Sequence, residues 1–179
     1  KRVGYRYRLG GGTFIKPFIE KVYVMPMDIT SIDIRTPEVM THGNVPIMTE
    51  STAQVKIDSS DSSIYMAAEH FLGLGRDGMR DIAANILEGK VREVIGAMTV
   101  EEIYRNRQDF SARVLASAKE DFGRMGLVVL SYALKDVSDS QGYLEALARP
   151  QVAAAKRDAA IAQAETEKEA VIKSSQDRK

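Results

Sequence analysis

The chain has 179 residues, of which 44% are apolar and 28% charged, and its formal net charge is zero. This composition supports a soluble domain with a core of its own, and the neutral balance excludes an overall electrostatic footprint for nucleic acid. Cysteine is absent, which excludes a disulfide framework, a thiolate nucleophile and a thiolate zinc site.

The first 21 residues are basic, although the chain as a whole is neutral. Glu20 is their single acid, against six bases: Lys1, Arg2, Arg6, Arg8, Lys16 and Lys21. One interpretation is a solvated terminus. The other is a membrane-proximal lead-in, in which each base near an anionic lipid surface contributes about 1 kcal/mol. In the second case we expect four side chains to lie nearest the bilayer: Lys1, Arg2, Arg6 and Arg8.

The two ends of the sequence indicate a fragment. It starts without Met, ends within a charged run and shows no signal-peptide pattern. It also contains no run of about 18 apolar residues, so no helix is expected to span a bilayer. We therefore expect any membrane anchor to lie outside these residues.

Residues 10–58 have the pattern of strands. After the flexible "GGGTF" of residues 10–14, strands are predicted over 22–27 and 29–36, and Gly43-Asn44 indicates a hairpin turn. The run "TAQVKID" from residue 52 alternates between apolar and polar side chains, which is typical of a half-buried antiparallel strand. Its apolar face comprises Ala53, Val55 and Ile57.

Residues 62–122 change to a helical period. A short helix is predicted to stop at Gly73, and a second begins near residue 76 with one apolar stripe, formed by Leu87, Val91, Val94 and Met98. Thr99 and Glu102 have the spacing of a capping box at the start of the next helix, with Met98 and Ile103 as the hydrophobic staple. Phe110 and Val114 continue its apolar stripe. The acids of "MTVEEIYRNRQDF" are thus explained by helix stability.

The last third of the chain begins with a strand over residues 126–137, predicted to place Val128, Leu130, Tyr132 and Leu134 on one face. A turn follows, then a short helix that Pro150 breaks or restarts. From residue 151 the chain is rich in Ala, Glu, Lys and Gln, and one helix there would reach about 43 Å. It is either a lone solvated helix or the start of a stalk that packs with neighbouring subunits. The candidate packing residues are Val152, Ile161, Val171 and Ile172.

No motif supports catalysis. Residues 73–78 match G-x-G-x-x-G, but they follow a predicted helix rather than a strand, so the glycines more simply separate two helices. His42 and His70 lack ligand spacing, and Ser131 and Asp136 have no histidine near them in sequence. We therefore expect no enzyme activity, no cofactor and no metal. A nucleotide-binding protein that uses residues 73–78 remains a third hypothesis.

Six stretches resemble flotillins, members of the SPFH (band 7) group of stomatin, prohibitin, flotillin and their relatives. In chain order they are "TPEVMTHGNVPI", "AQVKI", "AAEHFLG", "ILEGKVREVIGAMTVEEIYRNRQDF", "MGLVVLSYALKDV" and "GYLEALARPQVAAAKRDAAIAQAE". The absence of cysteine and the "GGGTF" lead-in look closer to bacterial flotillins than to animal ones. The resemblance implies an α+β SPFH domain, with an antiparallel sheet packed against helices, followed by the start of a long helical coiled-coil stalk.

The resemblance also implies the domain limits and the function. Residues 1–21 would be a membrane-proximal lead-in, residues 22–148 the SPFH domain and residues 149–179 the start of the stalk. Flotillins attach to the cytoplasmic face of the cell membrane through an N-terminal segment, form homo-oligomers and organise microdomains (lipid rafts) with their client proteins. The expected partners are thus anionic lipid, further copies and membrane proteins, and not nucleic acid. The alternative is a regulatory subunit that encloses or restrains a membrane protease or channel, as in related SPFH proteins.

Overall fold

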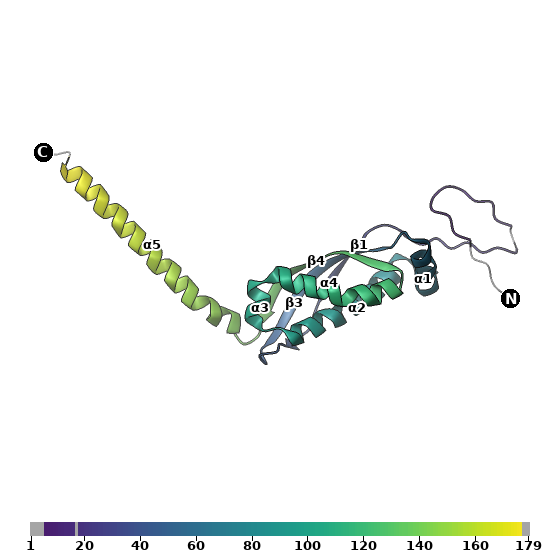
Figure 1. Cartoon of the computed structure of the whole chain (residues 1–179), viewed down its shortest axis with the longest axis horizontal. Coiled ribbons are helices and arrows are strands. Elements are labelled where there is room, and N and C mark those ends of the chain that lie inside the picture. Colours follow the sequence, from purple (N-terminus) through teal and green to yellow (C-terminus); the bar gives the residue numbers. More distant parts are fainter. Residues whose placement is uncertain (1–5, 17, 177–179) are drawn as a thin grey trace.

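The computed structural model describes residues 6–16 and 18–176, without the side chains of residues 151 and 169–176. It is an α+β fold in which an antiparallel sheet is covered on one face by helices, and one long helix leaves the body (Figure 1). The elements are β1 (Thr30–Arg35), β2 (Val39–Met40), β3 (Pro46–Ile57), α1 (Asp61–Phe71), α2 (Gly75–Ala97), α3 (Val100–Arg105), α4 (Arg107–Arg124), β4 (Leu127–Asp139) and α5 (Tyr143–Gln176).

Strand β3 is the centre of the sheet. Its residues pair with β1 and β2 along one edge and with β4 along the other, all antiparallel. The predicted alternation is confirmed, because Ala53, Val55 and Ile57 are fully buried while Gln54 is exposed. The predicted hairpin turn is also present between β2 and β3, where Asn44 has a φ of 56°.

Strand β4 departs from the predicted simple alternation. Its register against β3 shifts twice, so Leu130 and Lys135 have no partner opposite them. Each extra residue is a β-bulge, which resets the side chains that face the core. Leu130 is therefore exposed instead of sharing a face with Tyr132, and the buried residues are Leu127, Tyr132, Leu134 and Val137.

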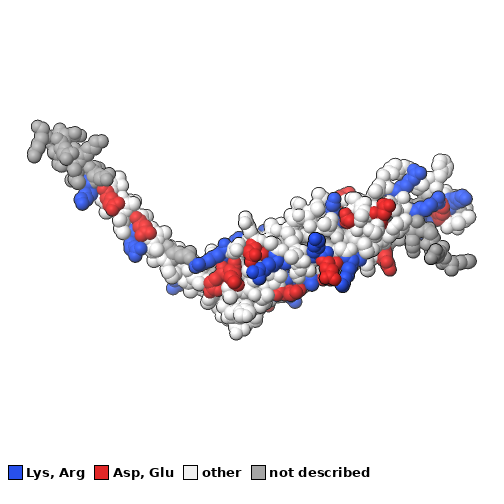
Figure 2. Space-filling view, viewed as in Figure 1, with Lys and Arg blue, Asp and Glu red and all other residues white. Residues whose placement is uncertain are grey.

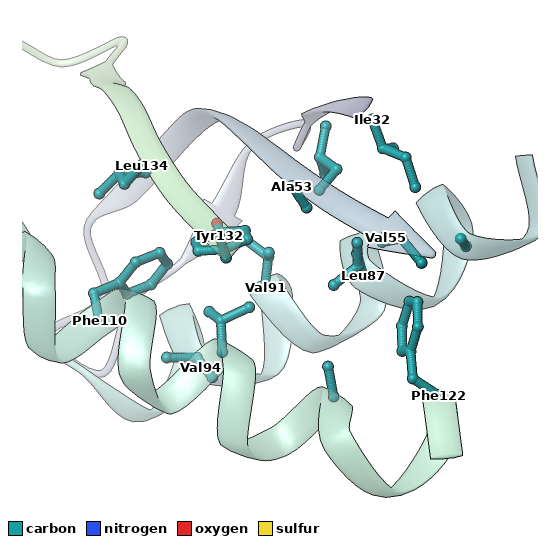
Figure 3. Packing of buried hydrophobic residues seen from close by; sticks show 14 of the residues in the cluster. Ile32, Ala53, Val55, Leu87, Val91, Val94, Phe110, Phe122, Tyr132 and Leu134 are labelled. Atoms are coloured by element: carbon teal, nitrogen blue, oxygen red, sulfur yellow. The ribbon is translucent and has the colours of Figure 1, made fainter. Parts of the chain in front are cut away.

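Helices α2 and α4 pack on the inner face of the sheet (Figure 3). The predicted stripe of α2 is confirmed, with Leu87 and Val91 fully buried. On α4 the buried residues are Phe110, Val114, Ala118 and Phe122. The Phe110 ring lies 6.3 Å from the ring of Tyr132, centroid to centroid, and so joins α4 to β4.

The capping box at Thr99 is confirmed. The Thr99 amide donates to the Glu102 carboxylate at 2.8 Å, and the Glu102 amide donates to the Thr99 hydroxyl at 3.3 Å. The helix that it starts is shorter than predicted, because α3 ends at Arg105 and α4 begins at Arg107. Asn106 separates them and caps α4 by accepting from the Asp109 amide at 3.3 Å. An asparagine is well suited to this cap.

Residues 22–27, predicted as a strand, form no strand. Pro26 has no N–H to donate to a ladder. Met25 and Met27 instead pack against the core, and Tyr23 lies against Gly73.

Helix α5 begins four residues after the end of β4 and continues past Pro150 to Gln176. The predicted break of this helix at Pro150 is therefore wrong. Asp139 caps its start by accepting from the amides of Tyr143 at 2.6 Å and Leu144 at 3.2 Å. Pro150 removes the hydrogen bond to the Ala146 carbonyl. Because Ala146 is exposed, water can bind that carbonyl and the helix continues. Figure 1 shows α5 extending away from the body, at the opposite end from the N-terminal loop.

Candidate membrane-contact loop

Residues 6–24, here called the N-terminal loop, carry a concentration of exposed apolar side chains. Phe14 is 101% exposed and Phe18 is 106% exposed, so neither ring packs against any other described part of the chain. The other large apolar residues that this loop exposes are Tyr7, Leu9, Ile15, Ile19, Val22, Tyr23 and Val24. Exposed large apolar side chains gathered on one segment are typical of a contact with a membrane or with another protein.

The loop closes on itself through Glu20. The Glu20 carboxylate pairs with Arg6 and accepts a hydrogen bond from the Lys16 amide at 2.9 Å. The amides of Ile19 and Glu20 in turn donate to the Lys16 carbonyl, at 3.3 and 3.1 Å. At the other turn of the loop, Gly10 and Gly11 adopt φ values of 74° and 81°, which glycine reaches without strain.

The base of the loop is attached to α1. The Tyr7 hydroxyl donates to Asp61, and this bond raises the pKa of Tyr7 above its ordinary value. The Tyr7 ring also packs edge-on against Tyr65, with centroids 5.5 Å apart. Further along, Asp28 forms an ion pair with Arg76 at the start of α2. These contacts hold the base, while the segment with Phe14 and Phe18 projects from the body (Figure 1).

Basic side chains surround the apolar ones. Arg6, Arg8, Lys16 and Lys21 are all exposed, and Figure 2 shows Lys and Arg side chains among uncharged atoms on this loop. The Lys21 ammonium lies 4.9 Å from the centroid of the Tyr23 ring, and the Tyr23 side chain raises the pKa of Lys21. Apolar rings with flanking cations are the chemistry that binds the interface of an anionic bilayer.

The structure separates the two sets of residues predicted as sites. Arg6 and Arg8 lie on the N-terminal loop, whereas Lys1 and Arg2 lie outside the described residues. Val152 and Ile161 are exposed on α5 at the other end of the molecule. Val171 and Ile172 belong to α5 by their backbone, and their side chains are outside the described part.

Phe14 and Phe18 were not among the predicted site residues. The signal was present in "FIKPFIEKVYV" (residues 14–24), where large apolar residues recur in pairs at a spacing of four, which is close to the pattern of one helix face. The structure forms neither a helix nor a strand over residues 14–16 and 18–24, so these side chains have no regular face through which to reach the core and stay exposed.

The G-x-G-x-x-G match lies between two helices. α1 ends at Phe71, α2 begins at Gly75, and Gly73 and Gly75 have φ values of 87° and 70°. A dinucleotide loop must instead follow a strand. The glycines therefore allow the chain to turn between the two helices, as predicted.

Closure of the N-terminal loop is expected to depend on pH through Glu20. The Lys16 amide, and then the charge of Arg6, hold the pKa of Glu20 below its ordinary value. A carboxylate with a lowered pKa stabilises the closed loop at neutral pH and loses that effect as the pH falls through the ordinary glutamate range towards the lowered value. We expect the protection of the Lys16 amide, measured by NMR as its exchange rate relative to the intrinsic rate at the same pH, to be lost on acidification. Glu20→Gln should exchange fast already at neutral pH, and equal rates for both proteins at neutral pH would contradict this assignment.

Within residues 6–16 and 18–176, none of the helices combines the length and the hydropathy that crossing a bilayer requires.

The chain is similar in sequence to known proteins. The model of the SPFH domain / Band 7 family matches residues 3–168. The chain is 46% identical over 160 residues to flotillin-like protein FloT of Bacillus subtilis, covering 89% of this chain and 31% of that protein. It is 39% identical to flotillin-1 of Drosophila melanogaster, and the match covers 92% of this chain and 39% of that protein. It is 38% identical to human flotillin-1, and the match covers 87% of this chain and 37% of that protein. The chain thus spans about a third of the length of the curated relatives that it matches.

Proposed function

The chain belongs to the SPFH domain / Band 7 family, and from that premise we propose that it is part of a membrane-associated scaffold without catalytic activity. Its similarity to flotillins supports a role in organising membrane microdomains and the proteins within them. The N-terminal loop would contact the lipid, and the long helix α5 would contact other copies. The membrane face would be the cytoplasmic one, because that leaflet carries the anionic lipid that attracts Lys and Arg.

The observation that carries the proposal is the full exposure of Phe14 and Phe18 on a loop that also bears Arg6, Arg8 and Lys16. In water, both rings add apolar surface that no part of the described chain covers. In the interfacial layer of a bilayer, the rings lose contact with water while the basic side chains remain among the headgroups. One loop binds weakly, but many copies held side by side gain about 10²–10⁴ in overall affinity.

Flotation with vesicles tests this proposal. We expect the chain to float with vesicles that contain phosphatidylserine at low salt. Salt should weaken the binding without abolishing it, because screening acts on the basic side chains and not on the apolar rings. A chain that stays unbound with these vesicles at low salt would rule the membrane contact out.

A further inference from the structure

The turn between α1 and α2, residues 72–74, exposes two leucines at a place where turns normally carry polar residues. Leu72 is 36% exposed and Leu74 is 51% exposed, with only Gly73 between them. Gly73 and Gly75 adopt φ values of 87° and 70°, which bend the chain on both sides of Leu74. In water this arrangement leaves two neighbouring apolar side chains partly hydrated, and burial against an apolar partner would remove them from water.

The position of Leu74 is well defined. Its amide donates to the Phe71 carbonyl at 3.0 Å, which ties it to the last turn of α1. On the other side, a Cβ atom at Gly78 would lie 2.8 Å from the Cβ atom of Leu74. The first turn of α2 can approach Leu74 this closely because residue 78 is a glycine. The leucine is therefore held in place before any partner binds, so binding costs little further ordering.

Contacts with the N-terminal loop place this turn beside the candidate membrane surface. The Tyr23 ring lies against the backbone of Gly73, 3.7 Å from the place that a Cβ atom would occupy. On α1, the Tyr65 side chain is 49% exposed, and its ring packs against Tyr7 of the loop. Figure 1 shows α1 at the end of the body from which the loop projects. A bilayer bound by the loop therefore lies close to the turn.

We propose that the turn between α1 and α2 is a second lipid contact, in which Leu72 and Leu74 enter the interfacial layer of the bilayer that the N-terminal loop binds. The inference rests on the proposed function, because the loop is what brings the bilayer to this end of the body. Lipid fits the turn because its two side chains are apolar and lie near Tyr23 and Tyr65, whose rings are of the type enriched at membrane interfaces. A second point of contact also limits how far the body can tilt on the membrane.

Tryptophan at position 74 tests the contact directly, since the chain contains no tryptophan. With phosphatidylserine vesicles, Leu74→Trp is expected to emit at shorter wavelength and to be quenched by brominated lipid. Asn85→Trp is the matched control, because Asn85 is exposed on α2 about 15 Å from the start of that helix, and it should show neither change. Unshifted and unquenched emission from position 74, in protein that floats with the vesicles, overturns the second contact. Equal changes at both positions overturn it as well, because they would not distinguish the turn from the rest of α2.

A negative charge at the same position tests the contact by flotation. Leu74→Glu should weaken binding to phosphatidylserine vesicles by about tenfold or more, because it removes apolar surface and sets an acid against anionic headgroups. The fold should not lose stability, since an acid beside the N-terminus of α2 is favourable. Asn85→Glu makes the same charge change farther along α2. It should bind within about twofold of the parent, because salt confines the effect of a charge to about 8 Å.

Urea unfolding of the free proteins checks that both glutamate variants are folded, and the tryptophan result decides if Leu74→Glu is not. Binding of Leu74→Glu that equals the parent, or an equal loss in Asn85→Glu, contradicts a contact at the turn. If the parent floats with the vesicles and either of these results is obtained, only the second contact fails. If the parent does not float, the proposed function fails as well.

Discussion

Gly126→Ala is expected to lower the free energy of unfolding by about 3 kcal/mol or more, which is a large part of the stability of a domain of this size. Gly126 joins α4 to β4 and has a φ of 73°, a conformation that costs an alanine about 1–2 kcal/mol. A Cβ atom placed there would lie 2.1 Å from the carbonyl oxygen of Ser63 and 2.8 Å from the amide nitrogen of Ala67.

Both of these atoms belong to the backbone of α1, so no side-chain rotation can relieve the clash. Helix α1 would have to move away from the β4 end of the sheet. This would also strain the hydrogen bond from the Asp58 amide to the Gly126 carbonyl, which is 3.0 Å long. Urea unfolding followed by circular dichroism measures the effect.

Gly123→Ala is the matched control. Gly123 lies three residues earlier, within α4, and a Cβ atom there would meet no other atom within 4 Å. Because alanine favours a helix over glycine, this variant should be as stable as the parent or more stable by up to about 1 kcal/mol. If Gly126→Ala unfolded at the same urea concentration as Gly123→Ala, the close packing of α1 on this turn would be wrong.

Phe14→Ser/Phe18→Ser is expected to weaken binding to phosphatidylserine vesicles by about 100-fold or more. Burying one phenylalanine side chain contributes about 1.5–3 kcal/mol, and about 1.4 kcal/mol corresponds to a tenfold change in affinity. Both rings are fully exposed, so the fold should lose nothing by the change. Vesicle flotation measures the binding, and the urea midpoint of the free protein checks that the fold is unchanged.

Met40→Ser/Leu130→Ser is the control for lost apolar surface. These two side chains are exposed on β2 and β4, away from the N-terminal loop. We expect this control to float as the parent does. An equal loss of binding in both double variants would show that general hydrophobicity, rather than the N-terminal loop, determines the contact.

Patterns within single elements could be predicted from the sequence. The alternation of Ala53, Val55 and Ile57 and the stripe through Leu87 and Val91 follow from burial of one face of a strand or a helix. The capping box at Thr99 depends on atoms only three residues apart, so local sequence is sufficient to predict it.

Features that depend on distant pairing could not be predicted in the same way. The bulges at Leu130 and Lys135 are set by the register of β4 against β3, which the pattern of β4 alone does not contain. The continuation of α5 past Pro150 depends on whether the Ala146 carbonyl can reach water.

The residues of the candidate site also differ in whether local sequence was enough to predict them. Charge was sufficient to select Arg6 and Arg8, which are exposed on the N-terminal loop, and their place near a membrane stays a prediction. Phe14 and Phe18 required the structure, because an apolar residue in a sequence is normally expected in the core, and only the fold shows that this loop projects from the body.

The contact between the N-terminal loop and lipid is the central claim, and tryptophan fluorescence tests it most directly. The chain contains no tryptophan, so Phe14→Trp introduces a single reporter. With phosphatidylserine vesicles we predict that its emission shifts to shorter wavelength and is quenched by brominated lipid. Tyr104→Trp, on α3 at the other end of the body, should show neither change. Emission from position 14 that stays unshifted and unquenched while the protein floats with the vesicles would contradict the account.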